Sequence, residues 1–316
     1  MFNRRIILKK IGSTGILIST GIMSNSVWSQ SNKIKVGFTA SADSAAAFVA
    51  QEEGFFKKRG LEVELILIAI NSTIPGALAS SSIDIGNPSP SVFLGAIDGG
   101  IDLLAIGTTS VVSKNVVAFG AVVRTGVNIQ QPKDFAGKRI GVPGLNAFLH
   151  VLFKKWLADK NVDSKLVTFI EVPFPSMPDV IRGGSLDGVI TAEPVMSRIV
   201  SAGTGSIFTH MAPDLTEELP TAFWASSRDW ATKNSDLVRR FRESTEEAVS
   251  FVKTNSAATQ LHISKYTRLP IEIIRSVPMP ILRNEITDRD LMNWSKIMTD
   301  QGMLRNQLDI SKLRFK

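Results

Sequence analysis

Apolar residues along most of the chain fall into short runs that alternate with segments of helical spacing. Four runs in the first third predict strands, and three segments between them predict helices, because strands and helices differ in the period of their apolar residues. The expected strands are 34–38, 61–67, 83–85 and 103–106, and the expected helices are 43–59, 74–80 and 90–98. Strands that alternate with helices form parallel sheets covered on both faces, so this pattern predicts an α/β lobe.

Local signals predict where two of these helices begin or end. Asp43 or Ser44 is expected to cap the helix at 43–59, because short polar side chains accept hydrogen bonds from the free N–H groups of a first turn. Gly60 is expected to end the same helix, since glycine readily adopts the left-handed conformation of a C-terminal cap. Ser89 followed by Pro90 predicts another helix start, with proline at the first helical position.

A run of apolar and β-branched residues at 116–124 predicts a long strand that leaves the first set of elements. The second set is expected to have strands at 139–142, 167–172 and 188–191 and helices at 146–160, 178–183 and 194–202. Residues 221–225 predict a return crossing, followed by a mostly helical C-terminal part. We therefore expect a first lobe at 30–120, a second lobe at 121–222, and a return to the first lobe with C-terminal helices at 223–316.

The first 29 residues have the pattern of an export signal. A basic head at 1–10 precedes a modestly apolar stretch at 11–23, which is shorter than the about 20 apolar residues that span a bilayer. The pair Arg4-Arg5 is typical of a twin-arginine signal, although Ile7 stands where that signal usually has Phe. The alternative, a buried amphipathic helix, is disfavoured by the glycines of this segment. We expect an exported, periplasmic protein.

Charge and cysteine content narrow the possible partners. The chain has 36 basic and 29 acidic residues, and four of the basic residues belong to the signal, which leaves a formal net charge of +3 for the remainder. No basic cluster typical of a nucleic-acid interface is present, so we expect no nucleic-acid partner. The absence of cysteine excludes disulfides, thiolate metal sites and a lipidated cysteine at the signal junction.

Four segments carry short motifs in a fixed order. The most specific is Gly-Phe-Phe-Lys-Lys-Arg-Gly-Leu-Glu-Val at 54–63, and the others lie at 76–86, 134–144 and 181–194. Together they resemble the ABC-transporter solute-binding proteins of the nitrate, sulfonate and taurine type, over roughly 33–255. The C-terminal sixty or so residues carry no motif of this kind.

The resemblance implies a two-lobed periplasmic-binding-protein fold of type II, in which each lobe is a mainly parallel sheet flanked by helices. It also implies a monomer without cofactor or metal that captures a small organic anion or zwitterion between its lobes. The lobes are expected to close about 116–124 and 221–225, and the closed form to deliver the ligand to a membrane permease and its ATPase.

Ligands of open α/β sheets bind beyond the carboxyl ends of the strands, where helix N-termini also offer free N–H groups. Four segments qualify as parts of such a site. A further candidate, the aromatic residue Trp224, lies at the predicted return crossing. The candidate ligand-binding residues are Ser41, Ala42, Asp43, Asn87, Ser89, Ser91, Asn146, Ala147, Phe148, Glu193 and Trp224.

Each candidate also has a purely structural interpretation. Ser89 and Asn146 are natural N-caps of the helices that follow them, and Phe148 and Trp224 suit a hydrophobic core. Glu193 either pairs with Arg198 on the next helix turn or faces a ligand. In the second case an acid would repel a purely anionic ligand, so Glu193 favours a ligand with an ammonium or another hydrogen-bond donor.

An enzyme is the second hypothesis, because the same fold hosts pyrimidine synthases and some small-acid dehydratases. The chain lacks the Cys-rich elements of the pyrimidine synthases, a Gly-x-Ser-x-Gly motif and a Walker loop. His150, His210 and His262 lack metal-ligand spacing, and His150 is expected to be exposed or half-buried. We therefore expect a binding protein without catalytic residues. A sensory receptor that signals through a membrane kinase is a third hypothesis.

Overall fold

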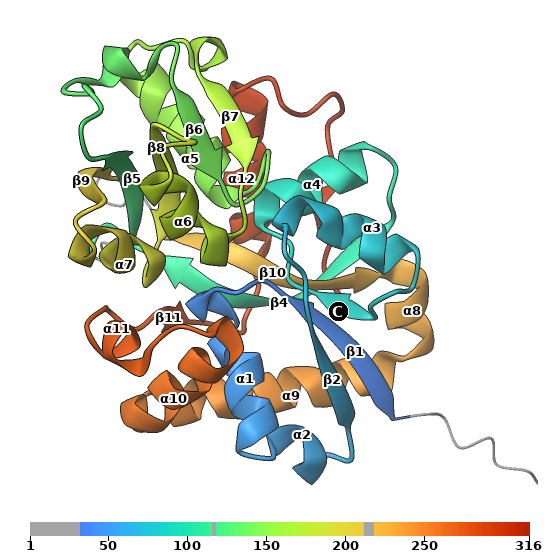
Figure 1. Cartoon of the computed structure of the whole chain (residues 1–316). Coiled ribbons are helices and arrows are strands. Elements are labelled where there is room, and N and C mark those ends of the chain that lie inside the picture. Colours follow the sequence, from blue (N-terminus) through green and yellow to red (C-terminus); the bar gives the residue numbers. More distant parts are fainter. Residues whose placement is uncertain (1–31, 116–117, 212–217) are drawn as a thin grey trace, which may run out of the picture. The chain divides into compact units, whose positions relative to one another are not determined.

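The computed structural model describes residues 32–115, 118–211 and 218–316. The predicted export signal lies outside the described residues, as do Val116 and Val117 at the start of the predicted crossover strand. Asn32–Lys316 form one unit by their contacts, and this unit contains two sheets, each flanked by helices (Figure 1). Among the described residues, no helix is both long and apolar enough to cross a bilayer.

The first sheet has six strands in the order β11-β4-β10-β3-β1-β2. Its strands are β1 (Lys33–Phe38), β2 (Glu62–Leu67), β3 (Ile85–Gly86), β4 (Leu103–Val112), β10 (Leu219–Ser227) and β11 (Ile281–Leu282). β1 pairs in parallel with β2 and β3, whereas β10 runs antiparallel to β3 and β4, and β11 antiparallel to β4. The sheet is therefore mixed, and the expectation of a mainly parallel sheet is corrected by the strands that return from the second lobe.

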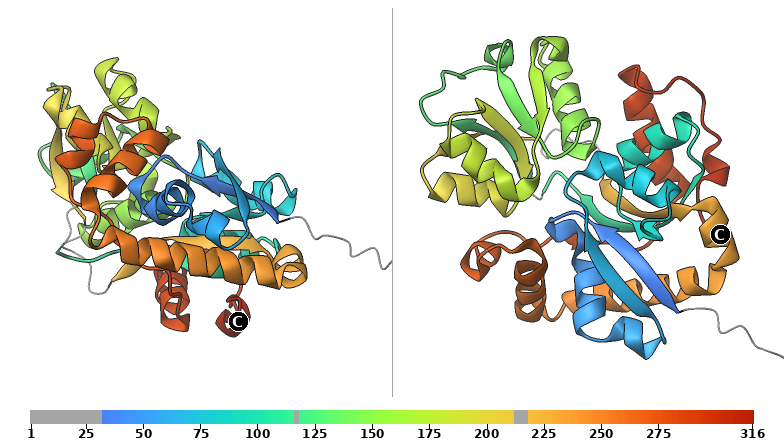
Figure 2. Two further views of the ribbon diagram at one scale, coloured as in Figure 1. Left: turned by 90° about the horizontal axis from the view of Figure 1, so that it is seen from below. Right: turned by 45° about the vertical axis from the view of Figure 1, so that its right-hand side comes forward.

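Helices cover both faces of this sheet. They are α1 (Ala45–Glu52), α2 (Phe55–Lys58), α3 (Ile74–Ala79), α4 (Pro90–Asp98), α8 (Arg228–Lys233), α9 (Ser235–Val252) and α12 (Asp288–Asp300). The two remaining helices of the C-terminal part, α10 (Ser256–Thr267) and α11 (Ile271–Arg275), share a core with α1 and with helices of the second lobe. α9 runs along one face of the sheet, as the left view of Figure 2 shows, and packs against α1 and α2. α12 packs against α4.

Alternate residues of the central strands face two different cores, as the period of a strand requires. Leu104 and Trp224 belong to the core that also contains residues of α1 and α9. Leu103 and Phe223 belong to the core that also contains residues of α3, α4 and α12. Neighbouring residues on β4 and on β10 are therefore buried on opposite faces of the sheet.

The second sheet has five strands in the order β7-β6-β8-β5-β9. Its strands are β5 (Phe119–Arg124), β6 (Arg139–Val142), β7 (Thr168–Glu171), β8 (Gly188–Ala192) and β9 (Gly205–His210), and its helices are α5 (Phe148–Asp159), α6 (Met177–Arg182) and α7 (Val195–Ser201). β6 pairs in parallel with β7 and β8, whereas β5 runs antiparallel to β8 and β9.

Several predicted boundaries differ from the structure. The predicted helix at 43–59 is divided into α1 and α2 by Gly54, whose positive φ of 75° interrupts the helix. The predicted strand at 103–106 continues to Val112 as β4. The predicted hinge segment at 221–225 lies inside β10 and pairs with β4, so it is part of the first sheet.

Candidate functional site

A cleft lies between the two sheets, where β1, β3, β6 and β8 end. It contains about 850 Å³ of empty space, including the part open to solvent. Because its walls come from strand ends of both lobes, it occupies the position at which α/β sheets bind ligands.

Most of the candidate residues from the sequence meet in this cleft. The ones that line it are Ser41, Ala42, Asp43, Asn87, Ser89, Ala147, Phe148 and Glu193. Ser91 and Asn146 line a separate surface hollow beside α4 and α12, and Trp224 is buried beneath the first sheet. That any of these residues binds a ligand stays a prediction.

Asp43 lies in the one-turn 3-10 helix Ala42–Ser44, directly after β1. Its Oδ1 accepts a hydrogen bond from Oγ of Ser110 at 2.8 Å, and its Oδ2 accepts one from Oγ of Ser41 at 3.4 Å. Its carboxylate therefore faces β4 and does not cap the following helix, which corrects one of the two predicted caps. Burial raises the pKa of this carboxyl, although the neighbouring hydroxyls favour its charged form.

A buried amide network shapes the next wall of the cleft. Nδ2 of Asn87 donates to Oγ of Ser44 at 2.7 Å, and its Oδ1 has no partner among the described residues. Asn71 donates to the carbonyl of Asn87 at 3.1 Å and accepts the N–H of Ser89 at 2.9 Å. Ser89 also caps α4, as predicted, by accepting the N–H of Val92 at 3.4 Å. The network therefore leaves the acceptor atom of Asn87 free beside the cleft.

Glu193 follows β8 and lines the cleft from the second lobe. Its Oε1 accepts the hydroxyl of Ser197 at 2.9 Å, and its Oε2 accepts the N–H of the same residue at 3.1 Å. The structure thus pairs Glu193 with Ser197 on α7, so the structural alternative of an ion pair with Arg198 is wrong. Burial raises the pKa of this carboxyl too.

The turn between β6 and α5 differs from its prediction. α5 begins at Phe148 with Ala147 as its N-cap, so Asn146 is not the cap. Asn146 has a positive φ of 60°, and its N–H donates to Nδ1 of His150 at 2.8 Å. His150 is buried, contrary to expectation, and burial lowers its pKa to about 4.

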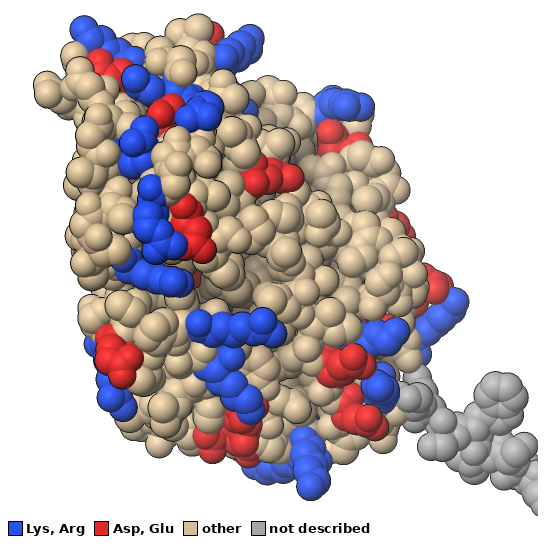
Figure 3. All heavy atoms as spheres, in the orientation of Figure 1, with Lys and Arg blue, Asp and Glu red and all other residues tan. Residues whose placement is uncertain are grey.

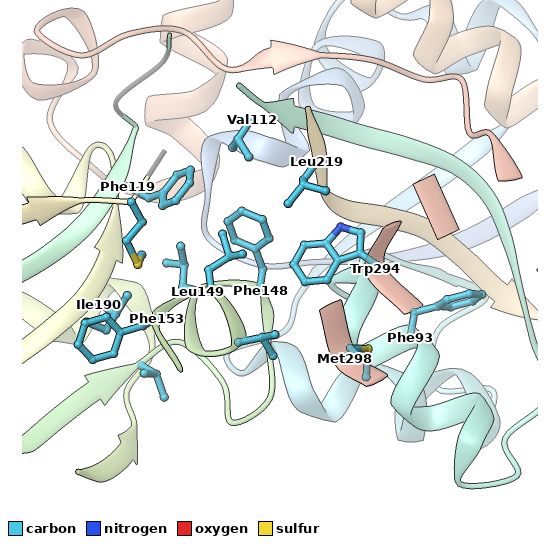
Figure 4. Close-up of a cluster of buried hydrophobic side chains, with 14 of the residues drawn as sticks. Phe93, Val112, Phe119, Phe148, Leu149, Phe153, Ile190, Leu219, Trp294 and Met298 are labelled. Carbon is cyan, nitrogen blue, oxygen red and sulfur yellow. The ribbon is translucent and has the colours of Figure 1, made fainter. Parts of the chain in front are cut away.

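The position of Phe148 agrees with both of its predicted interpretations. Its side chain lines the cleft and also packs in the core. Its ring lies 5.3 Å from that of Phe119 and 5.5 Å from that of Trp294 (Figure 4). Trp294 lies on α12, and Val112 and Leu219 belong to the same cluster. The cluster therefore joins the second lobe to the first beside the chain crossings.

Trp224 does not line the cleft because β10 turns alternate residues toward opposite faces. Its ring packs at 5.4 Å against that of Phe241 on α9. Ser91 occupies the first turn of α4, and its hydroxyl lies 3.3 Å from that of Ser89. Ser91 was expected in a segment that follows a strand and Trp224 at the return crossing, but neither side chain lines the cleft.

The described lining of the cleft is acidic. Asp43 and Glu193 are its ionisable residues, and no Lys, Arg or His belongs to it. Elsewhere, acidic and basic side chains are intermixed over the visible face (Figure 3). No group of three His, Asp or Glu side chains in the described part of the chain is placed to hold a metal ion. Two carboxylates and the free oxygen of Asn87 thus offer acceptors to a ligand that donates hydrogen bonds.

Several wall residues were not among the candidates predicted from the sequence. Asn71 follows β2, so the rule of strand ends would have found it if it had been applied to that strand. Pro278 and Pro280 reach the cleft from the C-terminal part of the chain, and Thr221 reaches it from β10. Pro278 and Pro280 lie far along the sequence from the other wall residues, and no local pattern marks them, whereas Thr221 lies in the predicted return crossing.

Comparison with solved structures shows the fold. The alkanesulfonate-binding protein SsuA from Xanthomonas axonopodis pv. citri, bound to MOPS, aligns with a TM-score of 0.76 at 17% identity, over 90% of this chain and 98% of that chain. The periplasmic nitrate-binding protein NrtA from Synechocystis PCC 6803 aligns with a TM-score of 0.77 at 18% identity, over 90% of this chain and 86% of that chain. The two-lobed periplasmic-binding-protein fold expected from the sequence is therefore confirmed.

Comparison of sequences shows the family. A Haemophilus influenzae protein provisionally named for thiamine biosynthesis is 28% identical over 159 residues, which cover 50% of this chain and 49% of that protein. The match thus spans about half the length of this relative. The family model described as NMT1/THI5 like matches residues 41–258, which include both lobes and most of the cleft wall. The chain belongs to the NMT1/THI5-like family.

Proposed function

We propose that the protein is the substrate-binding component of an ABC importer and that it captures a small molecule between its lobes. The observation that carries this proposal is the cleft itself, whose walls combine strand ends of both sheets. A ligand that contacts both lobes stabilises their closed arrangement, which a permease and its ATPase can then recognise. The protein acts as an exported monomer in the periplasm under this proposal.

The packed cluster around Phe148 and Trp294 is the pivot of that closure in our proposal. It lies beside Val112 and Leu219, where the chain leaves and re-enters the first sheet. Side chains that stay packed on this side let the lobes separate on the opposite side, where Asp43 and Glu193 face the cleft.

The lining favours a zwitterionic or cationic ligand over a simple anion. Asp43 and Glu193 approach the cleft from different lobes, and burial raises the pKa of both. A protonated amine or a ring N–H placed between them gains charge-assisted hydrogen bonds, whereas nitrate or a plain sulfonate meets like charge. The free Oδ1 of Asn87 adds a third acceptor.

Aminopyrimidines fit this chemistry, because they carry ring nitrogens that take up protons and exocyclic N–H donors. The relative named for thiamine biosynthesis supports this class. The same name supports the alternative that the chain is an enzyme acting on such a compound. The two functions differ in whether the bound compound is recovered unchanged.

The test is a thermal-unfolding and calorimetry screen of the exported protein after unfolding, dialysis and refolding to remove co-purified compounds. The panel contains thiamine, 4-aminopyrimidines, taurine, an alkanesulfonate and nitrate. Binding to the native state adds about 2.7 kcal/mol at a free concentration about a hundredfold above Kd. A large shift with an amine or aminopyrimidine that is recovered intact supports the proposal. Binding of nitrate or the sulfonate alone contradicts the ligand class, and consumption of the compound supports the enzyme.

A further inference from the structure

One carboxylate oxygen connects the two lobes at the edge of the cleft. Oε1 of Glu171, the last residue of β7, accepts the hydroxyl of Ser72 at 2.7 Å. The same oxygen accepts the N–H of Leu145, also at 2.7 Å. Ser72 belongs to the first lobe, in the turn Asn71–Thr73 that follows β2, whereas Leu145 and Glu171 belong to the second. Glu171 therefore joins a turn of its own lobe to a turn of the other lobe.

Both of these turns supply walls of the cleft. Asn71 lines it beside Ser72, and Pro143 and Ala147 line it on either side of Leu145. A shift of either turn therefore moves atoms that face the proposed ligand.

The lobes approach closely at this point. A Cβ atom at Gly144 would lie 3.3 Å from the backbone N of Ser72 and 3.6 Å from Cβ of Asn71. A distance of 3.3 Å is tighter than nine in ten contacts that a real Cβ atom makes. The glycine thus allows the second-lobe turn to lie against the first-lobe turn, with the Ser72–Glu171 hydrogen bond beside the contact.

We infer that Glu171 is a positioning residue that favours closure through Ser72, and its role in ligand binding rests on the proposed function. Separation of the lobes breaks the hydrogen bond between Ser72 and Glu171, but it leaves the bond between Glu171 and Leu145 inside the second lobe. An interaction present in only one of two arrangements shifts the population toward that arrangement. The bond to Leu145 holds the carboxylate and the cleft turn in place for the next closure.

The size of the effect follows from the chemistry and the exposure of the pair. A hydrogen bond to a charged group is stronger than a neutral one, but Glu171 is exposed and water screens it. We expect loss of the Ser72 hydroxyl to lower the ratio of closed to open protein about fivefold, the factor that corresponds to about 1 kcal/mol. Since the bond exists only after closure, ligand dissociation should accelerate by a similar factor while association changes little.

The absence of cysteine allows the lobes to be labelled specifically. Ala79 at the end of α3 and Ala158 on α5 are both exposed, and neither lines the cleft. Spin labels at Ala79→Cys and Ala158→Cys report the distance between the lobes by pulsed electron spin resonance. The distance distribution is recorded without ligand for the labelled parent and for the same protein with Ser72→Ala, Ser72→Thr or Glu171→Gln.

We expect Ser72→Ala to move population from the short to the long distance between the labels. Ser72→Thr keeps a hydroxyl and should give the same distribution as the parent. Glu171→Gln should behave like a weakened parent, because its neutral oxygen accepts more weakly. Ser311→Ala is the matched control, since Ser311 donates to Asp309 within the first lobe. Equal distributions in the parent, Ser72→Ala and Glu171→Gln proteins would overturn the inference.

The outcome is separable from that of the ligand screen. A shifted distribution in Ser72→Ala with no panel compound bound to the parent would refute the proposed function and leave the role of Glu171 in closure intact. Unchanged distance distributions in the variants, together with a panel compound that binds the parent tightly, would refute the role of Glu171 in closure and leave the proposed function intact. Thermal unfolding of each variant without ligand checks that the fold is unaffected, because a merely structural loss lowers the unfolding temperature and leaves the distance distribution of the folded protein unchanged.

Discussion

Replacement of Glu193 by Gln should change ligand binding and ligand-free stability in opposite directions. Glu193 faces the cleft, and its two oxygens accept from the N–H and hydroxyl of Ser197. Glutamine keeps the shape of the side chain and removes the charge. Its oxygen can still accept the N–H of Ser197, and its NH2 group can donate to the hydroxyl of Ser197, which then accepts. The substitution therefore isolates the contribution of the negative charge.

The loss of affinity can be sized from the interactions of the site. A hydrogen bond to a charged group contributes about 1.5–3 kcal/mol, and the half-buried position of Glu193 places it toward the lower end. Since 1.4 kcal/mol corresponds to a tenfold change in Kd, an amine or aminopyrimidinium ligand should bind Glu193→Gln about ten- to thirtyfold more weakly.

The ligand-free protein should gain stability at neutral pH. Burial raises the pKa of Glu193 in the folded state above its usual value of 4.5, so the folded protein holds this proton more tightly than the unfolded chain. The free energy of unfolding therefore falls as pH rises from about 4.5 through the raised pKa, and at pH 7 the charged carboxylate destabilises the fold. Glutamine does not titrate and removes this penalty.

Calorimetry and urea unfolding at pH 7 measure the two effects. Glu62→Gln is the matched control, because Glu62 is exposed at the start of β2 and its loss changes the net charge equally. An unchanged Kd for cationic ligands in Glu193→Gln, together with unchanged stability, would refute the argument that the cleft is organised around buried acceptors.

Three further predictions concern the framework of the site. Gly120→Ala should lower the free energy of unfolding by about 2–3 kcal/mol in urea unfolding, because its Cβ would lie 2.3 Å from the carbonyl oxygen of Thr209. Gly76→Ala, whose Cβ would have no atom of the described part of the chain within 4 Å, should raise it by about 0.5–1 kcal/mol. Asn71→Ala should lower the free energy of unfolding by about 1–3 kcal/mol in the same assay, because it leaves the N–H of Ser89 unpaired. An equal loss in the exposed control Asn306→Ala would count against the stabilising role of this network. Burial lowers the pKa of His150 from 6.5 to about 4, so the folded state loses about 3 kcal/mol of stability as pH falls from 6.5 to 4. This loss should be absent from His150→Gln when unfolding is compared at pH 7.5 and 4.5, and an identical pH dependence in the two proteins would contradict it.

The spacing of apolar residues predicted the strands and helices well, because buried residues recur with a different period in a strand and in a helix. The order of strands and helices was sufficient to expect two α/β lobes, and the strand-end rule brought Asp43, Asn87 and Glu193 to one cleft. The directions of β5, which enters the second sheet, and of β10, which returns to the first, were not predictable from local pattern, because pairing between distant segments decides them.

Side-chain direction was the main limit for the site. Asp43 has the position of a helix cap, but hydroxyls of Ser41 and Ser110 bind its carboxylate, and Ser110 lies on a distant strand. Phe223 and Trp224 are equally apolar neighbours, and only the packed sheet decides which core each enters. Pro278 and Pro280 reach the cleft through the tertiary fold alone.

A crystal structure with the tightest-binding compound of the panel tests the central claim most directly. We predict density for the compound in the cleft, with an amine or ring N–H within hydrogen-bonding distance of the carboxylates of Asp43 and Glu193 and a further donor facing Oδ1 of Asn87. A compound bound outside the cleft, or an anion held there without any donor toward Asp43 or Glu193, would contradict the account.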